Sequence, residues 1–191
     1  MNNCLLWKSI LEKKPNQKLM YIHTPKCGGT YVKQILKDLE IDYKDGHVLA
    51  NKNEGINFTI IRDPVERFES LLNFRLSTLQ NSFIKRLQYV YKNETLSLND
   101  IVGLMTDDEI LGFKPYRSLS YWSQNVDILI TIDQLPQFLQ CSGYKYNPNN
   151  YDKTNVSKKL RGTFSNETRE RIRKLYYPDV LLFNMVTRSI T

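Results

Sequence analysis

The chain has 191 residues, of which 41% are hydrophobic and 25% charged, a composition typical of a folded domain without low-complexity linkers. This length suits one domain and is short for two, so we expect a single domain over residues 1–191. The net charge of +7 favours an anionic partner such as a nucleotide, an acidic glycan or nucleic acid, although a soluble basic surface explains it equally well.

The sequence argues against a membrane-spanning or secreted protein. No apolar run is long enough to cross a membrane, and the opening segment MNNCLLWKSILEKKPNQ has only a short apolar patch. Cys4, Cys27 and Cys141 are odd in number and far apart, so they indicate neither a disulfide framework nor a metal-ligand cluster. We therefore expect a reducing, cytoplasmic location.

The first half of the chain contains two successive units of strand, turn and helix. After an expected helix over about 4–13, the run KLMYIH at 18–23 predicts a short buried strand that ends at a turn containing Pro25. Helical spacing starts at Thr30 and is carried by Val32, Ile35, Leu36 and Leu39.

The second unit follows the same plan. The run NFTIIR at 57–62 predicts a strand, because it is rich in β-branched and aromatic residues. Asp63 is suited to cap a helix whose first residue is Pro64, a position that proline favours.

The remaining chain is expected to add one strand and several helices, with Ser97 and Ser165 as N-caps. The expected segments are a mostly helical stretch at 80–112, a buried strand at 126–132, a short helix at 134–140, an Asn-rich loop at 144–159 and two final helices separated by Pro178.

This alternation predicts an α/β fold of three layers, P-loop-like, with a central, mainly parallel sheet flanked by helices. In such folds ligands bind at the carboxyl ends of the strands. Lys26, Gly28, Gly29 and Arg62 all fall there.

The glycine turn has the features of a phosphate cradle. Glycines at 28 and 29 let an anion approach the backbone, and the amides of Gly29, Thr30 and Tyr31 would open a helix whose dipole favours negative charge. Lys26 adds a cation and Thr30 a hydroxyl. The lysine precedes the glycines, unlike in the triphosphate loop G-x-x-x-x-G-K-[ST], so an ATP or GTP site of that kind is not expected. A tight turn without a ligand is the alternative.

A second anion site is predicted after the second strand. Arg62 ends that strand, where its guanidinium can bind phosphate oxygens, and Ser70 lies two helical turns later. A serine at such a position is usually only solvated. Together the two turns suit a nucleotide that carries phosphates at two separate positions.

The segments HTPKCGGTYV and IIRDPVERFESLLNF resemble the nucleotide-binding segments of the sulfotransferases that use 3'-phosphoadenosine 5'-phosphosulfate (PAPS). The resemblance is strongest over about 18–76 and is weaker at VDILITIDQLPQFL and SNETRERIRKLYYPDVLLF. It implies that the P-K-x-G-G-T loop, residues 25–30, holds the 5'-phosphosulfate. It also implies that Arg62 and Ser70 hold the 3'-phosphate.

The same resemblance bears on the other residues of the site. Lys26 would stabilise charge on the leaving phosphate, with the helix-start amides sharing that role. Cys27 replaces a threonine that is frequent in the family, and beside Lys26 at a helix start we expect its thiol to have a lowered pKa and to be open to oxidation. Lys159 and Arg161 in SKKLRG loosely resemble a loop that binds the 3'-phosphate, although a solvated basic loop is the preferred interpretation.

A general base is needed for the acceptor hydroxyl, and the chain has only two histidines. The GHV around His47 resembles the segment that carries the catalytic histidine of the uronyl 2-O-sulfotransferases, which implies that His47 is the base. An ordinary loop histidine is the alternative. His23 is expected to have a supporting role in the site. If His47 proved distant, His23 or an acid such as Glu69 or Asp45 would become the candidate base.

We therefore expect a sulfotransferase that uses PAPS as donor, releases 3',5'-bisphosphoadenosine (PAP), needs no metal and acts on a hydroxyl, with a carbohydrate as the favoured acceptor. The aromatic residues Tyr116, Tyr121 and Trp122 suit either packing or an acceptor groove. A non-catalytic sensor of a bisphosphorylated adenine nucleotide is the second hypothesis. A nucleic-acid binder ranks last, because no recognised module is present.

Overall fold

The computed structural model describes residues 3–44, 46–78, 96–112, 117–151 and 162–188. Four of the residues singled out above, Lys159, Arg161, Tyr116 and Asp45, lie outside the described residues, as does much of the expected helical stretch 80–112.

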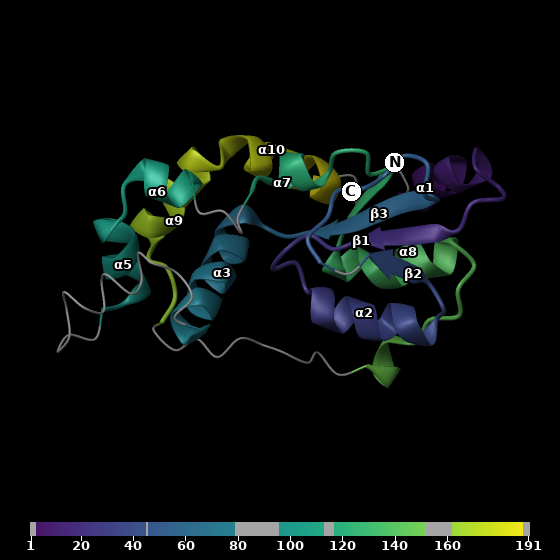
Figure 1. The fold of residues 1–191 in the computed structure, drawn as a ribbon, viewed down its shortest axis with the longest axis horizontal. Helices are drawn as coiled ribbons and strands as arrows, with labels where there is room; N and C mark the ends of the chain where they lie inside the picture. The colour runs from purple at the N-terminus through teal and green to yellow at the C-terminus, as the bar shows by residue number, and fades with distance from the viewer. Residues whose placement is uncertain (1–2, 45, 79–95, 113–116, 152–161, 189–191) are drawn as a thin grey trace.

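The centre of the described fold is a four-stranded, all-parallel sheet with strand order β2-β1-β3-β4 (Figure 1). Its strands are β1 (Leu19–Ile22), β2 (Asp42–Lys44), β3 (Ile56–Ile61) and β4 (Ile128–Thr131). The three strands expected from apolar runs are present, and the α/β class with a parallel sheet is confirmed. Strand β2 was not expected, because it is a short, polar edge strand.

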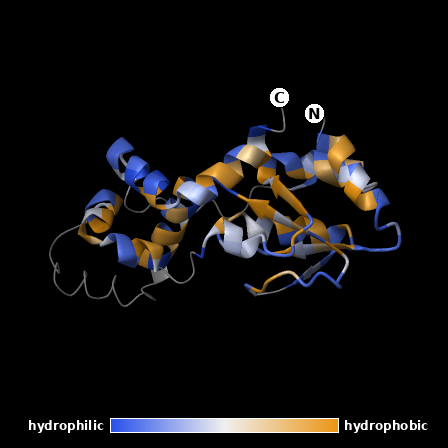
Figure 2. Cartoon of the chain, turned by 90° about the horizontal axis from the view of Figure 1, so that it is seen from above, coloured by the Kyte–Doolittle hydropathy of each residue, from blue (hydrophilic) through white to orange (hydrophobic). Residues whose placement is uncertain are grey.

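Apolar side chains on both faces of the sheet explain why helices cover it twice. Every residue of the central strand β3 is buried, and the strands lie mostly in the hydrophobic colours of Figure 2. Helices α2 (Gly29–Asp38) and α8 (Leu135–Cys141) lie on one side of the sheet in Figure 1, and α7 (Leu119–Trp122) and α10 (Tyr177–Arg188) on the other. No helix among the described residues has both the length and the apolar character of a membrane span.

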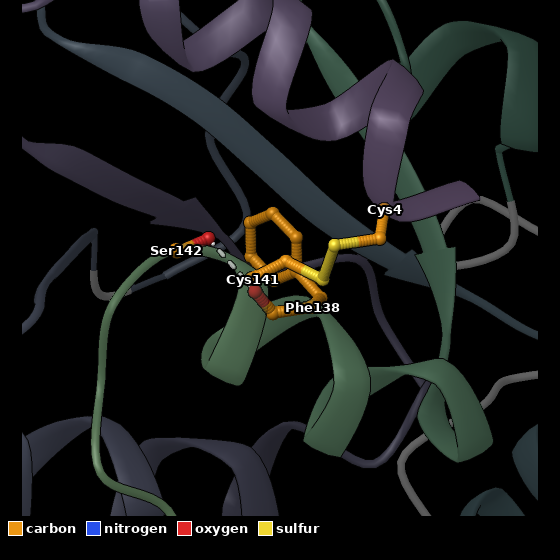
Figure 3. Close-up of a disulfide and its surroundings, with 4 residues drawn as sticks. All are labelled: Cys4, Phe138, Cys141 and Ser142. Atoms are coloured by element: carbon orange, nitrogen blue, oxygen red, sulfur yellow. Dashed lines mark hydrogen bonds between the residues drawn. A yellow bond between two sulfur atoms is a disulfide. The ribbon is translucent and has the colours of Figure 1, made fainter. Parts of the chain in front are cut away.

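Helix α1 (Asn3–Glu12) is joined to α8 by a disulfide between Cys4 and Cys141 (Figure 3). The prediction that the cysteines form no disulfide is therefore wrong. These two residues are 137 positions apart in the chain, and they meet because Trp7 of α1 packs edge-on against Phe138 of α8, with ring centroids 5.5 Å apart. A structural disulfide is typical of an oxidising compartment, so it counts against the reducing location expected from the sequence.

A second hydrophobic cluster lies beside the sheet and is built mostly from helices. It involves α3 (Pro64–Thr78), α5 (Leu98–Leu104), α6 (Asp107–Leu111) and α9 (Asn166–Leu175). Phe68 of α3 is at its centre, with the rings of Phe164 and Tyr176 each 6.1 Å away. Ser97 and Ser165 cap α5 and α9 as predicted, each accepting a bond from a backbone N–H of the first turn. Two short 3-10 turns, η2 (Ile132–Gln134) and η3 (Pro148–Asn150), complete the described elements.

Candidate functional site

The turns that follow β1 and β3 lie against each other at the carboxyl edge of the sheet. Nε of Arg67, on the helix that follows the Arg62 turn, donates to the carbonyl of Pro25 at 2.9 Å, and the Lys26 ammonium lies 4.3 Å from the ring centroid of Phe74 on the same helix. Deeper in the fold, the buried hydroxyls of Thr24 and Thr59 are 2.8 Å apart. These contacts bring the lysine-glycine turn and the Arg62 turn onto one surface, which is the arrangement that the sequence predicted.

The β1–α2 turn leaves several backbone donors unpaired among the described residues. Lys26 and Gly28 both have a left-handed backbone, with φ of 64° and 83°. Among the described residues, none accepts a hydrogen bond from the backbone N–H groups of residues 28–31, and Gly28 has no side-chain cap. Unpaired N–H groups at a helix start are a favourable environment for an anion.

Gly29 is required for a reason that the sequence did not reveal. A Cβ at this position would overlap the imidazole of His23, which lies against the start of α2. Gly28 is different, because a Cβ there meets only Ile132 at 3.5 Å and the restriction comes from its positive φ. The two glycines therefore serve a close side-chain contact and a left-handed turn, respectively.

Lys26 lies among other cations. Its ammonium sits 4.3 Å from the ring centroid of Phe74 on α3. Partial burial, and then the charges of Arg62 and Arg75, lower the pKa of Lys26. A bound anion would relieve the repulsion among these three charges.

Cys27 does not have the reactive thiol that was expected. Its side chain is only 2% exposed, and burial raises the pKa of the thiol despite nearby arginines. The sulfur also contacts the carbonyl of Pro25 at 3.6 Å. Residue 27 therefore packs beneath the turn, and the prediction of a lowered pKa is wrong because burial outweighs the helix start and the nearby cations.

The β3–α3 turn presents side chains rather than backbone. Asp63 caps α3 as predicted, since its Oδ1 accepts from the N–H groups of Val65 and Glu66 at 2.9 and 3.0 Å. Nε of Arg62 donates to Glu66 Oε2 at 3.2 Å, in a largely exposed pair. Ser70 is partly buried and lies one helical turn before Phe74, the residue under the Lys26 ammonium.

The two histidines form a pair beside the cradle. The rings of His23 and His47 have centroids 5.2 Å apart, and His47 also meets the indole of Trp122 at 6.0 Å. Burial of the ring lowers the pKa of His47, and the positive charges of Lys33 and two α3 arginines add to this effect. His47 is therefore neutral at pH 7 and able to accept a proton.

Trp122 is held in place by the contacts of its helix, α7, and of its neighbour Tyr121. It is 5% exposed and belongs to α7, whose Leu119 N–H donates to the buried carboxylate of Asp179 at 2.7 Å. Tyr121 packs edge-on against Trp122 and carries the guanidinium of Arg117 over its ring at 4.3 Å. Tyr121 and Trp122 thus pack against each other, and the Trp122 ring lies against one member of the histidine pair.

Of the remaining predicted residues, two lie near the β1–α2 turn and one lies away from it. Thr30 is exposed at the start of α2, where a ligand can reach its hydroxyl, and Tyr31 contacts the hydroxyl of Tyr146 at 3.1 Å. Glu69, an alternative base, is buried in the helical cluster, where its carboxylate accepts from the Phe164 N–H at 3.0 Å. It is therefore a structural residue rather than a base for this site.

One residue of the site was missed. Arg67 of α3 is fully buried, and its Nε donates to the Pro25 carbonyl of the β1–α2 turn at 2.9 Å. An arginine in an amphipathic helix is usually solvated, so the sequence contained no signal for it.

Among the described residues, no group of three or more His, Cys, Asp or Glu side chains is arranged to hold a metal ion. Comparisons with protein-family models, with curated proteins and with solved structures found no match.

Proposed function

We propose that this chain is a sulfotransferase with a P-loop-like nucleotide site, which moves a sulfuryl group from PAPS to an acceptor hydroxyl. The observation that carries the proposal is the contact between the two units: Arg67 of α3 donates to the Pro25 carbonyl, and Phe74 of the same helix lies under the Lys26 ammonium, next to the unpaired amides. A single nucleotide can reach both turns only if they share one surface, as these do.

The residues present fit a donor with two separate phosphates. The amides of residues 28–31, the hydroxyl of Thr30 and the ammonium of Lys26 would hold the 5'-phosphosulfate. Arg62 would exchange its exposed pairing with Glu66 for the 3'-phosphate, at small cost because exposed ion pairs contribute little. Ser70, on the same helix, would add a hydroxyl to that phosphate.

The donor supplies a sulfuryl group, and the products are a sulfated acceptor, PAP and a proton. As the bond from sulfur to the leaving phosphate oxygen breaks, negative charge grows on that oxygen. Lys26 and the amides at the start of α2 are positioned to meet this charge. Their positions are set by the fold before the nucleotide binds, so little reorganisation is needed.

His47 is the proposed base for the acceptor hydroxyl. It is neutral at pH 7 and exposed to solvent, and its ring packs against that of His23, whose imidazole lies against Gly29 at the start of α2. His23 is assigned a supporting role there. A carbohydrate remains the favoured acceptor. Trp122 is buried and supports the His47 ring, whereas the partly buried Tyr121, packed against Trp122, is the aromatic side chain that a sugar ring could reach.

A cytoplasmic location remains a prediction from the sequence. The disulfide between Cys4 and Cys141 bears against it, because the cytoplasm keeps most thiols reduced.

Transfer of radiolabelled sulfate from PAPS onto a panel of glycans tests the proposal. We expect transfer by the wild-type chain, and a loss of about 100-fold or more in His47→Ala with the same thermal unfolding curve. Transfer that is undiminished in His47→Ala would remove this residue from the mechanism. Nucleotide binding without transfer to any acceptor would instead favour the hypothesis of a non-catalytic nucleotide sensor. If ATP with magnesium protects the chain against thermal unfolding better than PAP does, both hypotheses are contradicted.

A further inference from the structure

Arg67 connects the two sides of the candidate site. Its exposed fraction is 0%, and its guanidinium donates through Nε to the Pro25 carbonyl at 2.9 Å and through Nη1 to the Arg117 carbonyl at 3.0 Å. A buried charge is costly, and its planar fork reaches carbonyls that a lysine could not reach together. The two contacted carbonyls therefore indicate what this side chain holds.

The first contact fixes a peptide group of the cradle. The Pro25 carbonyl and the Lys26 N–H belong to one peptide, and in a trans peptide they point in opposite directions. With the carbonyl held by Arg67, the Lys26 N–H points away from the buried guanidinium. Among the described residues, none accepts a hydrogen bond from this N–H.

The backbone of Lys26 needs such support. Its φ of 64° is a left-handed conformation that residues with a Cβ adopt rarely and under strain. Strained residues of this kind persist where neighbouring contacts fix them, and they gather at ligand sites. The contact from Arg67 to the carbonyl immediately before Lys26 provides that restraint.

The second contact reaches the acceptor side. Arg117 directly precedes Ser118, whose hydroxyl accepts from the Tyr121 N–H and caps α7. Helix α7 carries Trp122, the neighbour of His47. The guanidinium of Arg67 thus contacts both the β1–α2 turn and the residue before α7, the helix that carries Trp122 beside His47.

We propose that Arg67 is a positioning residue, which orients the Pro25–Lys26 peptide so that the Lys26 N–H joins the amides of residues 28–31 as a donor to the 5'-phosphate. This inference rests on the proposed function. Arg67 itself does not touch the nucleotide. Its loss therefore weakens binding of the 5'-phosphate and leaves binding of the 3'-phosphate at Arg62 and Ser70 intact.

The test compares the dissociation constants of PAP and adenosine 3'-monophosphate by calorimetry, for the wild type, Arg67→Lys and Arg67→Met. We expect Arg67→Met to weaken PAP by about tenfold and the monophosphate by less than about twofold, so that the preference for PAP collapses. Arg67→Lys keeps the charge without the fork and is expected to lie between, which preserves the test if the methionine variant does not fold.

Leu72→Ala is the matched control, because Leu72 is a fully buried residue of the same helix that faces the helical cluster. It is expected to lower the unfolding temperature and to keep the wild-type preference for PAP. Equal weakening of both nucleotides in Arg67→Lys, or an unchanged preference, overturns the inference alone. A wild-type chain without a preference for PAP overturns the proposed function as well.

Discussion

The turns after β1 and β3 lie at the same edge of the sheet, yet they offer an anion different groups. The β1–α2 turn offers backbone: two left-handed residues, open amides at the start of α2 and a buried cysteine beneath. The β3–α3 turn offers side chains: an arginine that is paired with Glu66 in solvent and a partly buried serine.

This difference predicts how each turn responds to substitution. The backbone turn is preformed, so a phosphate that binds there does not have to order it, and an added Cβ is the change that damages it. The side-chain turn must rearrange, since Arg62 leaves Glu66 when a phosphate arrives. There, removal of a side chain is the damaging change.

The largest effect on nucleotide binding is expected from Gly29→Ala. The new Cβ overlaps the His23 imidazole, so His23 or the start of α2 must move. Overpacking of this kind costs about 1 to 3 kcal/mol. Because PAP binds the undistorted turn, that cost opposes binding and corresponds to a loss of PAP affinity of up to about 100-fold, measured by calorimetry.

Gly103→Ala is the control for that change. Gly103 lies in α5, and a Cβ there has nothing within 4 Å. The substitution should stabilise the chain by up to about 1 kcal/mol and leave PAP affinity unchanged. Unchanged affinity in Gly29→Ala as well would mean that the cradle is not the binding site.

A somewhat smaller loss is expected from Arg62→Ala. Removing one charge-assisted bond to the 3'-phosphate costs about 2 kcal/mol, or roughly 30-fold in PAP affinity, and leaves adenosine 5'-monophosphate unaffected. Glu66→Gln is the companion variant, because it frees Arg62 from its ion pair and should not weaken PAP. Equal weakening of both nucleotides by Arg62→Ala would contradict the assignment.

The rate of sulfuryl transfer, measured as a function of pH, reports on catalysis. Over the same pH range we expect PAP affinity to change by less than about twofold. Burial lowers the pKa of His47 from the ordinary 6.5. Because the base must be neutral, activity is level above that lowered pKa and falls as the pH drops through it, so the acid limb lies below pH 6.5. In His47→Ala the residual rate should lack this limb, and an acid limb that persists there belongs to another group.

The smallest effect on binding is expected from the double variant Cys4→Ser with Cys141→Ser. The disulfide joins α1 to α8 at the end of the sheet where β1 and β3 begin, away from the two turns (Figure 1). Its removal should cost about 2 to 5 kcal/mol of stability, measured by denaturant unfolding, with no change in PAP affinity. A drop in affinity would couple the disulfide to the cradle.

Local patterns in the sequence predicted much of this arrangement. Apolar runs located β1, β3 and β4, and capping chemistry located Asp63 and the helix that it starts. These features depend on residues that are close together in the chain, so local sequence patterns are enough to predict them.

The features that escaped prediction depend on residues distant in the chain. The pairing of Cys4 with Cys141 follows from the packing of α1 on α8, and the burial of Arg67 follows from the path of the β1–α2 turn. The burial of Cys27 and Glu69 also depends on residues distant in the chain, which is why reactive roles were expected for both. Their residue types suited chemistry, whereas their burial is set by tertiary contacts.

The most direct test of the central claim is a crystal structure of the chain with PAP bound. The account predicts the 5'-phosphate on the amides of residues 28–31 beside Lys26, and the 3'-phosphate between Arg62 and Ser70 of the same molecule. Two phosphates bound away from this edge of the sheet, or one turn left without contact to the nucleotide, would contradict it.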